Sequence, residues 1–232
     1  MQRLSIGRRV ASVDVMDEPD PQNRRGRPRL RSDDVILAAA LKAFAEAGFQ
    51  AMSVRALSAS LGLSHEAVGQ RFGSKLDLFH ATIDYGMTQL YASLEAAAHE
   101  PAVPVDDLAL LRELLRAFMI GAAANPELGR IINQESLTAS ERLDFIVERA
   151  VEPGVRPLQE LLTRLADDRH IRRTTAREVF FLAQAGAAPF TLVGLSSAFD
   201  NVDGPFHAEG HIDQVADLIV NGLALPKRTR SR

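Results

Sequence analysis

The sequence predicts an all-α protein, and three observations support this fold class. Apolar residues recur at helical spacing in nearly every segment after Ser32, and no alternating apolar and polar stretch is long enough for a convincing strand. Ala, Leu, Arg and Glu, which favour helices, dominate these segments. Ser, Thr or Asn precedes most of the apolar repeats, where a helix needs a cap. About nine helices are expected, three short ones followed by six that are mostly longer.

Residues 1–31 contain eight arginines and show no helical period. Because Gly26 and Pro28 disfavour a helix, this stretch is expected to be a flexible basic arm. The first helix then begins after Ser32 and carries Asp33 and Asp34 in its first turn, where the helix dipole favours negative charge. Its apolar set is Val35, Ile36, Ala39, Ala40, Ala43 and Phe44, and it is expected to end at Gly48.

The starts of the next three helices are indicated by serine residues that can cap them. Ser53 and Ser64 are expected to cap two short helices, Val54–Ser60 and Ser64–Arg71, with a tight turn at Gly62 between them. Ser74 and Asp77 form a capping-box pattern that opens a long helix to about Ala98.

The remaining helices follow a loop over 99–106. A helix carries Leu108 to Met119, and Asn125-Pro126-Glu127 marks the start of the next. Capping boxes are expected at Thr138 and Thr175. The helix from Thr138 should kink or break at Pro153, Gly154 and Pro157, and the helix from Thr175 should run to about Phe199, interrupted by Pro189. The last helix, about His211 to Leu223, places Ile212, Val215, Leu218, Ile219 and Leu223 on one face.

Composition excludes several classes of protein. Of 232 residues, 46% are hydrophobic and none is cysteine, which excludes a disordered chain, a disulfide scaffold and a thiolate metal site. No apolar run approaches the ~20 residues of a membrane span, and no apolar signal-peptide core follows the basic N-terminus. A soluble cytoplasmic protein that does not span a membrane is expected.

The charge is divided unevenly along the chain. Residues 1–80 carry 12 Lys or Arg against 9 Asp or Glu, residues 81–226 carry 11 against 21, and the last six residues add four basic side chains. A basic segment on an acidic body is typical of a protein that turns one end toward a polyanion. A basic arm without a partner is the alternative.

The segment Ser53–Lys75 has the length and glycine placement of a helix-turn-helix, whose second helix fits the major groove of DNA. Apolar residues on one side would hold the two helices against the first, namely Leu57, Leu61, Leu63, Val68 and Phe72. The exposed positions of the second helix then carry His65, Glu66, Ala67, Gln70 and Arg71.

The combined motifs resemble the DNA-binding domain of TetR/AcrR-family transcriptional regulators over about residues 32–80. They are Phe44-Ala45-Glu46-Ala47-Gly48-Phe49, Ser53-Val54-Arg55-Ala56-Leu57, Gly62-Leu63-Ser64 and Phe72-Gly73-Ser74-Lys75-Leu76-Asp77-Leu78-Phe79. The resemblance implies a homodimer, a ligand pocket within the C-terminal helices, and release of an operator when ligand binds.

One position departs from the family pattern. The family usually has a leucine-tyrosine pair on the recognition helix, whereas this chain has Val68-Gly69 and so lacks the tyrosine that grips a phosphate. Arg71 stands where the family often has histidine, and its guanidinium is expected to replace part of that contact.

Charge and position give each DNA-binding residue an expected role. Arginines of the arm suit a narrow minor groove, or alternatively phosphates alone. His65 and Gln70 suit base edges, while Glu66 suits either a cytosine or the helix dipole. Ser53 and Ser64 serve first as caps, and Lys75 with the free N–H groups at Ser74 suits a phosphate. The expected DNA-binding residues are Arg27, Arg29, Ser53, Arg55, Ser64, His65, Glu66, Gln70, Arg71 and Lys75.

The C-terminal helices are expected to hold an effector and a dimer interface. The last two helices have more apolar surface than a monomer needs, and the family pairs them with their twins. The pocket residues expected are Phe118, Met119, Phe145, Phe181 and Gln184, with Asn133, Gln134 and Glu135 if these point inward. Few cationic residues fall in these stretches, which favours a neutral or cationic effector. His207 and His211 have a metal-compatible spacing but lack a third ligand, so no metal or other cofactor is expected.

The sequence therefore predicts a basic arm (1–31), a helix-turn-helix domain (32–80, the head), a helical ligand-binding and dimerisation domain (81–225, the body) and a basic tail (226–232). We expect a regulator, not an enzyme, that binds a palindromic DNA operator as a homodimer and is released by a small-molecule effector. The alternatives are an effector-independent regulator of the same fold and an all-α enzyme or carrier without specific DNA binding.

Overall fold

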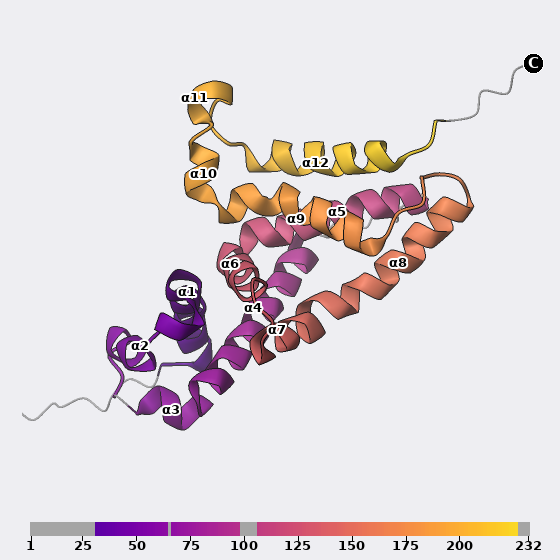
Figure 1. Cartoon of the computed structure of the whole chain (residues 1–232). Helices are drawn as coiled ribbons and strands as arrows, with labels where there is room; N and C mark the ends of the chain where they lie inside the picture. Colours follow the sequence, from indigo (N-terminus) through magenta and orange to yellow (C-terminus); the bar gives the residue numbers. More distant parts are fainter. Residues whose placement is uncertain (1–30, 65, 98–105, 227–232) are drawn as a thin grey trace, which may run out of the picture. The chain divides into compact units, whose positions relative to one another are not determined.

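A computed structural model describes residues 31–64, 66–97 and 106–226 of the chain (Figure 1). Within these ranges the protein is α-helical, and the β pairing there is limited to an isolated bridge between Ile171 and Ala224, which confirms the all-α class. The elements are α1 (Asp33–Ala51), α2 (Val54–Ser60), α3 (Ala67–Phe72), α4 (Lys75–Ala97), α5 (Asp107–Ala124), α6 (Pro126–Glu135), α7 (Glu141–Ile146), the π-helical turn η2 (Val147–Val151), α8 (Glu152–Asp167), α9 (Ala176–Thr191), α10 (Val193–Ser197), α11 (Asp200–Asp203) and α12 (Ala208–Leu223).

Prolines explain where the helices depart from those expected. At Pro153 and Pro157, where a kink or break is predicted, α7, η2 and α8 follow one another without a gap, and a π turn precedes the two prolines. The predicted helix to Phe199 instead ends at Thr191, two residues after Pro189, and the chain bends by 77° into the segment of α10 and α11. Proline lacks the backbone N–H donor in both places. A widened π turn precedes Pro153, and helix α9 ends just after Pro189.

Three of the expected caps form, at Ser53, Ser74 and Thr175. Ser74 and Asp77 exchange hydrogen bonds at the start of α4, and Thr175 with Glu178 makes the predicted capping box of α9. Thr138 does not cap, since α7 begins later and the hydroxyl of Ser140 accepts from the Leu143 amide.

Two further caps differ from the prediction. The side chain of Asn125 does not cap α6, but donates instead to the Gly121 carbonyl and so closes the end of α5. Ser32 precedes α1 without a side-chain cap hydrogen bond.

The described residues pack around two hydrophobic clusters. One joins α1 to α4 and also takes Leu128, Ile131 and Ile146 from α6 and α7, so the core of the head continues into the body. The predicted domain boundary at residue 80 falls inside the unbroken helix α4. The second cluster lies among α5, α8, α9 and α12, which run beside one another (Figure 1).

Ion pairs fasten α5 to α12. Arg112 Nε lies 2.6 Å from an oxygen of Asp217, and Arg116 Nε lies 2.6 Å from Asp213. The hydrogen bond from Arg112 holds the pKa of Asp217 below its usual range. On the outer side of α12, Leu218 is 71% exposed, although its spacing predicted a buried position.

None of the described helices is long and apolar enough by itself to cross a membrane, although α9 together with residues 193–203 passes that test as a bent pair.

Candidate nucleic-acid interface and effector cavity

Helices α2 and α3 and the turn between them form the predicted helix-turn-helix. The Ser53 hydroxyl caps α2 by accepting from the Ala56 amide. Gly62 has a φ of 68°, a left-handed conformation that favours glycine and reverses the chain after α2. The Leu63 amide then donates to the Ser58 carbonyl at 2.9 Å, which closes the turn.

Apolar contacts fix the orientation of the second helix. Leu57 and Val68 are buried, while Leu61, Leu63 and Phe72 pack against them from partly buried positions, as predicted. Phe44, Phe49 and Phe79 form the aromatic centre of this cluster, with ring centroids 5.2 to 6.0 Å apart. These contacts therefore fix the buried face of α3 against the other helices, and the opposite face of α3 is turned outward.

Helix α3 is shorter than expected. It begins at Ala67 with Glu66 at the N-cap position, whereas the sequence predicted a start at Ser64. Ser64 is exposed and its carbonyl accepts from the Ala67 amide, so the side chain does not cap the helix. The exposed positions are Glu66, Gly69, Gln70 and Arg71, with Gln70 donating to Glu66 at 3.4 Å, whereas Ala67 is partly buried.

Arg71 is engaged within the chain. Its guanidinium lies 3.0 Å from Asp33 at the start of α1 and also donates to the Arg31 carbonyl. Arg31 in turn donates from Nε to the Leu61 carbonyl at 3.4 Å. These contacts tie the end of the recognition helix to the residue where the arm joins the head. A DNA contact by Arg71 would have to share or replace the Asp33 pair.

Lys75 and the cap of α4 lie beside this helix. The Lys75 ammonium donates to the Gln50 carbonyl at 3.1 Å and stands 4.9 Å from the Phe49 ring centroid. The Ser74 amide and hydroxyl both donate to the Asp77 carboxylate, which lowers the pKa of Asp77. The Ser74 and Asp77 amides, expected to be free for a phosphate, are therefore already occupied.

The remaining predicted DNA contacts differ in their surroundings. Arg55 is exposed on α2, and none of the described residues pairs with it. Arg27, Arg29 and His65 lie outside the described residues. Gly69 is exposed with open space around its α-carbon, so the position that departs from the family pattern can accept a side chain.

Residues 36–82, which contain this helix-turn-helix, match the sequence profile described as bacterial regulatory proteins of the tetR family. The helix-turn-helix segment of this chain is therefore similar to that of TetR-family regulators. No curated protein sequence matches the chain.

Solved structures share the fold of this chain beyond the head. A protein described as a fatty acid metabolism regulator of Clostridium perfringens is 17% identical with a TM-score of 0.63, over 82% of this chain and 99% of that one. The ketosteroid transcriptional regulator KstR2 of Mycobacterium tuberculosis is 18% identical with a TM-score of 0.62, over 86% and 98%. AibR, solved in complex with isovaleryl coenzyme A and operator DNA, is 20% identical with a TM-score of 0.55, over 82% and 96%. At these identities the likeness establishes the fold.

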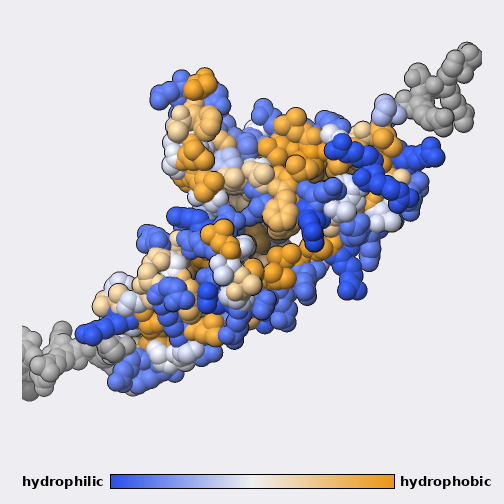
Figure 2. All heavy atoms as spheres, viewed as in Figure 1, coloured by the Kyte–Doolittle hydropathy of each residue, from blue (hydrophilic) through white to orange (hydrophobic). Residues whose placement is uncertain are grey.

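A cavity of about 1080 Å³ opens in the body of the chain. Its walls come from α6, α7, η2, α8 and the first half of α9, and Figure 2 shows the molecule hollowed on this side, with hydrophobic residues around the opening. The described side chains at its wall include Ile132, Asn133, Leu143, Ile146, Val151, Val155, Arg156, Gln159, Arg177, Phe180, Phe181 and Gln184.

Some of the predicted pocket residues line this cavity and others do not. Phe181, Gln184 and Asn133 line it, and Gln184 donates to Asn133 at 2.8 Å. The other expected residues do not line it. Met119 is fully buried in the core of the body, Phe118 packs on Phe180, and Phe145 stacks on His80 with ring centroids 3.9 Å apart. Gln134 donates to the Ala45 carbonyl, and Glu135 is paired with Arg142.

Two arginines that the sequence reading missed line the same cavity. Arg156 comes from α8 and Arg177 from the first turn of α9, which corrects the expectation that cationic residues are scarce there. Arg156 lies between two prolines in a stretch that was predicted to break, so its helical face could not be assigned. The π turn η2 was the missed structural signal, because such turns are frequent at functional sites.

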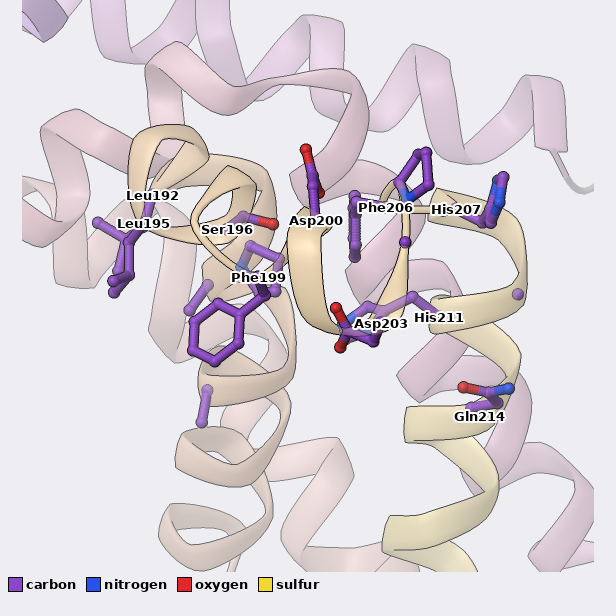
Figure 3. Close-up of a pocket in the computed structure, with 16 residues that line it drawn as sticks. Leu192, Leu195, Ser196, Phe199, Asp200, Asp203, Phe206, His207, His211 and Gln214 are labelled. Atoms are coloured by element: carbon purple, nitrogen blue, oxygen red, sulfur yellow. The ribbon is translucent and has the colours of Figure 1, made fainter.

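A second cavity, of about 610 Å³, lies where α9, α10, α11 and α12 meet (Figure 3). Phe199, Phe206, His207 and His211 are among its walls, and His211 Nε2 is 2.7 Å from the Gly186 carbonyl. His207 is the N-cap residue of α12 and makes no side-chain cap hydrogen bond. Within the ranges described, no group of three or more His, Cys, Asp or Glu could hold a metal ion.

Proposed function

We propose that the protein binds a palindromic DNA operator through α3 and the basic residues around it, and acts as a repressor released by a small molecule. The observation that carries this proposal is the outward face of α3, whose opposite face is fixed by the buried Val68 and Leu57. A recognition helix presented in this way can enter the major groove. Arg55 and Lys75 stand beside it and suit phosphates.

Selection of bound fragments from random DNA tests this function. We expect a palindromic consensus, and an affinity for it that falls steeply with salt because phosphate contacts release counterions. Arg55→Ala should lower the slope of log affinity against log salt by about 1, the value for one phosphate contact. Lys42→Ala removes the same charge from an exposed site on α1 and should leave the slope unchanged. No sequence preference would overturn the proposal and favour a carrier or enzyme.

We propose further that two copies pair through α9 and α12. Leu182 and Leu218 are exposed on these helices, and hydrophobic residues also cover α10 and α11, which project at the upper left of Figure 2. Pairing would bury this surface and supply the two recognition helices that a palindrome needs. Leu218→Asp should give a monomer in sedimentation experiments, whereas Leu137→Asp, at an exposed leucine between α6 and α7, should leave a dimer. A wild-type monomer both alone and on DNA would contradict the pairing.

Helices α6 and α7 are well placed to link the cavity to the head. Asn133 of α6 faces the cavity, while the adjacent Gln134 donates to the Ala45 carbonyl of α1 at 3.1 Å. Arg142 of α7 lies 4.3 Å from the ring centroid of Phe49. We infer that a ligand in the cavity shifts these helices and so biases the position of the head, a change between two states.

A variant can separate the coupling between cavity and head from the binding of ligand and of operator. Gln134→Leu removes the hydrogen bond to the head, so the ligand should still bind while its effect on operator affinity shrinks. AibR holds an acyl coenzyme A and operator DNA on the same fold, which supports looking for an effector in this body. If no compound changes operator affinity in the wild-type protein, the effector-independent alternative holds.

A further inference from the structure

The wall of the larger cavity carries two exposed arginines that form no ion pair with the described residues. Of the eleven arginines of the body, seven make ion pairs with carboxylates: Arg112, Arg116, Arg130, Arg142, Arg149, Arg164 and Arg173. The side chains of Arg156 and Arg177 make neither an ion pair nor a hydrogen bond to any described residue, and both residues line the cavity. Glu152 is the acidic side chain of the wall, so the balance there is positive.

The two arginines stand at the same part of the cavity. Gln159 lies three residues after Arg156, and therefore on the same face of α8. Its side-chain oxygen accepts from the Ala176 amide at 2.9 Å, and Ala176 directly precedes Arg177. This hydrogen bond joins α8 to the start of α9 and brings the two arginine positions to one end of the wall.

The other polar groups of the wall are largely satisfied. Asn133 and Gln184 bond to each other, Gln159 bonds to Ala176, and Thr175 is used in the cap of α9 with Glu178. The remaining wall is mostly apolar, from Ile132, Ile146, Val151, Val155 and Phe180 among others. A ligand therefore meets an apolar surface and, as open polar partners, two guanidinium groups.

We infer that the cavity binds an amphiphilic anion, an apolar chain or ring that ends in a carboxylate or a phosphate held by Arg156 and Arg177. The guanidinium fork matches both head groups, and burial of the apolar part against the wall supplies the rest of the affinity. The cavity volume of about 1080 Å³ is at the upper end of small-molecule sites and leaves room for a long chain or fused rings. This inference rests on the proposed effector cavity and names the chemical class that it takes.

Isothermal titration of the full chain with four probes of equal chain length tests the inference. The probes are decanoate, decyl phosphate, decanol and decyltrimethylammonium. Both anions should bind at least about tenfold more tightly than decanol, because a charge-assisted hydrogen bond contributes that much, and the cation should bind no better than decanol. The tighter of the two anions identifies the preferred head group. Equal binding of decanol and the anions, or tighter binding of the cation, would overturn the inference.

Arginine variants locate the binding site. Arg156→Gln and Arg177→Gln should each weaken decanoate about tenfold, and the double variant should bind decanoate no better than decanol. Arg173→Gln is the matched control, since it removes the same charge from an exposed arginine paired with Asp167 outside the cavity. Unchanged decanoate affinity in the double variant would overturn the assignment.

Operator binding, measured separately on selected DNA, distinguishes the two proposals. A protein that binds its operator but shows no preference for anions keeps the regulatory function and loses the anion site. A protein that binds anions through the two arginines but has no sequence preference on DNA keeps the site and loses the function.

Discussion

The head and the body of this protein use their charged residues in different ways. In the body seven of the eleven arginines are paired with carboxylates, and five of these pairs join two helices, as between α5 and α12 or between α8 and Asp107. In the head, Arg71 is paired with Asp33, Arg55 is exposed and unpaired, and the structure is held mainly by apolar side chains around the Phe44, Phe49 and Phe79 rings. Ion pairs between helices fasten the body, whereas the unpaired Arg55 of the head stays available to a polyanion.

Four arginines of the body form no ion pair within the described protein, and two of these, Arg156 and Arg177, line the larger cavity. An unpaired arginine together with its surroundings therefore indicates two binding surfaces, one around Arg55 for DNA and one at the cavity for a small anion. Both assignments follow from what surrounds the side chains, because residue type alone does not separate a paired arginine from an unpaired one.

The largest effect is expected from removing an aromatic ring of the head. Phe44 is 1% exposed and contacts both other rings of its cluster, so Phe44→Ala should lower the free energy of unfolding by about 3–5 kcal/mol. Urea denaturation measures the change. Val35→Ala alters an apolar residue of the same helix that is 41% exposed, and should change stability by less than about 0.5 kcal/mol. A loss below 1 kcal/mol for Phe44→Ala would show that the rings do not hold the head together.

Substitutions at two glycines test how closely the helices pack in the body and in the head. A β-carbon at Gly186 of α9 would lie 2.5 Å from Val215 Cγ1 of α12, whereas one at Gly69 of α3 would meet nothing within 4 Å. Gly186→Ala should therefore force the helices apart and cost about 1–3 kcal/mol. Gly69→Ala should instead stabilise the protein by up to about 1 kcal/mol, through helix propensity. Thermal unfolding of both variants measures the signs, and a stabilising Gly186→Ala would contradict the close packing of α9 on α12.

How much of this could be read from the sequence differs between the two regions. The caps at Ser53, Ser74 and Thr175 and the buried positions Leu57 and Val68 follow from local spacing, which determines short helices well. The start of α3 was placed too early at Ser64, since a serine before a helix can cap it or simply precede it. Local patterns fix which face of a short helix is buried, and they are less reliable for its first residue.

The cavity could be predicted only in part, because it depends on contacts between distant segments. The sequence predicts Phe181 and Gln184 at the cavity, and they line it. Met119 lies in the core instead, because an apolar residue suits a core position as well as a cavity wall. Arg156 is missing from the predicted pocket because the prolines around it predict a kink or break, whereas the chain continues as a helix after a π turn. Helical periodicity does not anticipate a widened turn, so the face of α8 beyond it could not be assigned.

The smallest effect is expected from the ion pairs between α5 and α12. The Arg112 hydrogen bond lowers the pKa of Asp217 from its usual 3.8, so the pair stabilises the fold above that pH and its contribution is lost as the pH falls through the lowered pKa. Asp217→Asn should be slightly less stable than the wild-type protein at pH 7, and the difference should shrink in strong acid. Urea denaturation across the acid range measures this.

Glu46→Gln provides the control in the head, since it removes one carboxylate from an exposed pair with Lys42 at 3.9 Å. Exposed pairs of that length contribute little to stability, so this variant should follow the wild-type pH dependence. If Asp217→Asn also follows it, the close Arg112–Asp217 pair does not fasten the body, and the packing of Gly186 against Val215 would have to hold α12 in place. If only Asp217→Asn departs from it, paired charge and close packing both contribute to the stability of the body.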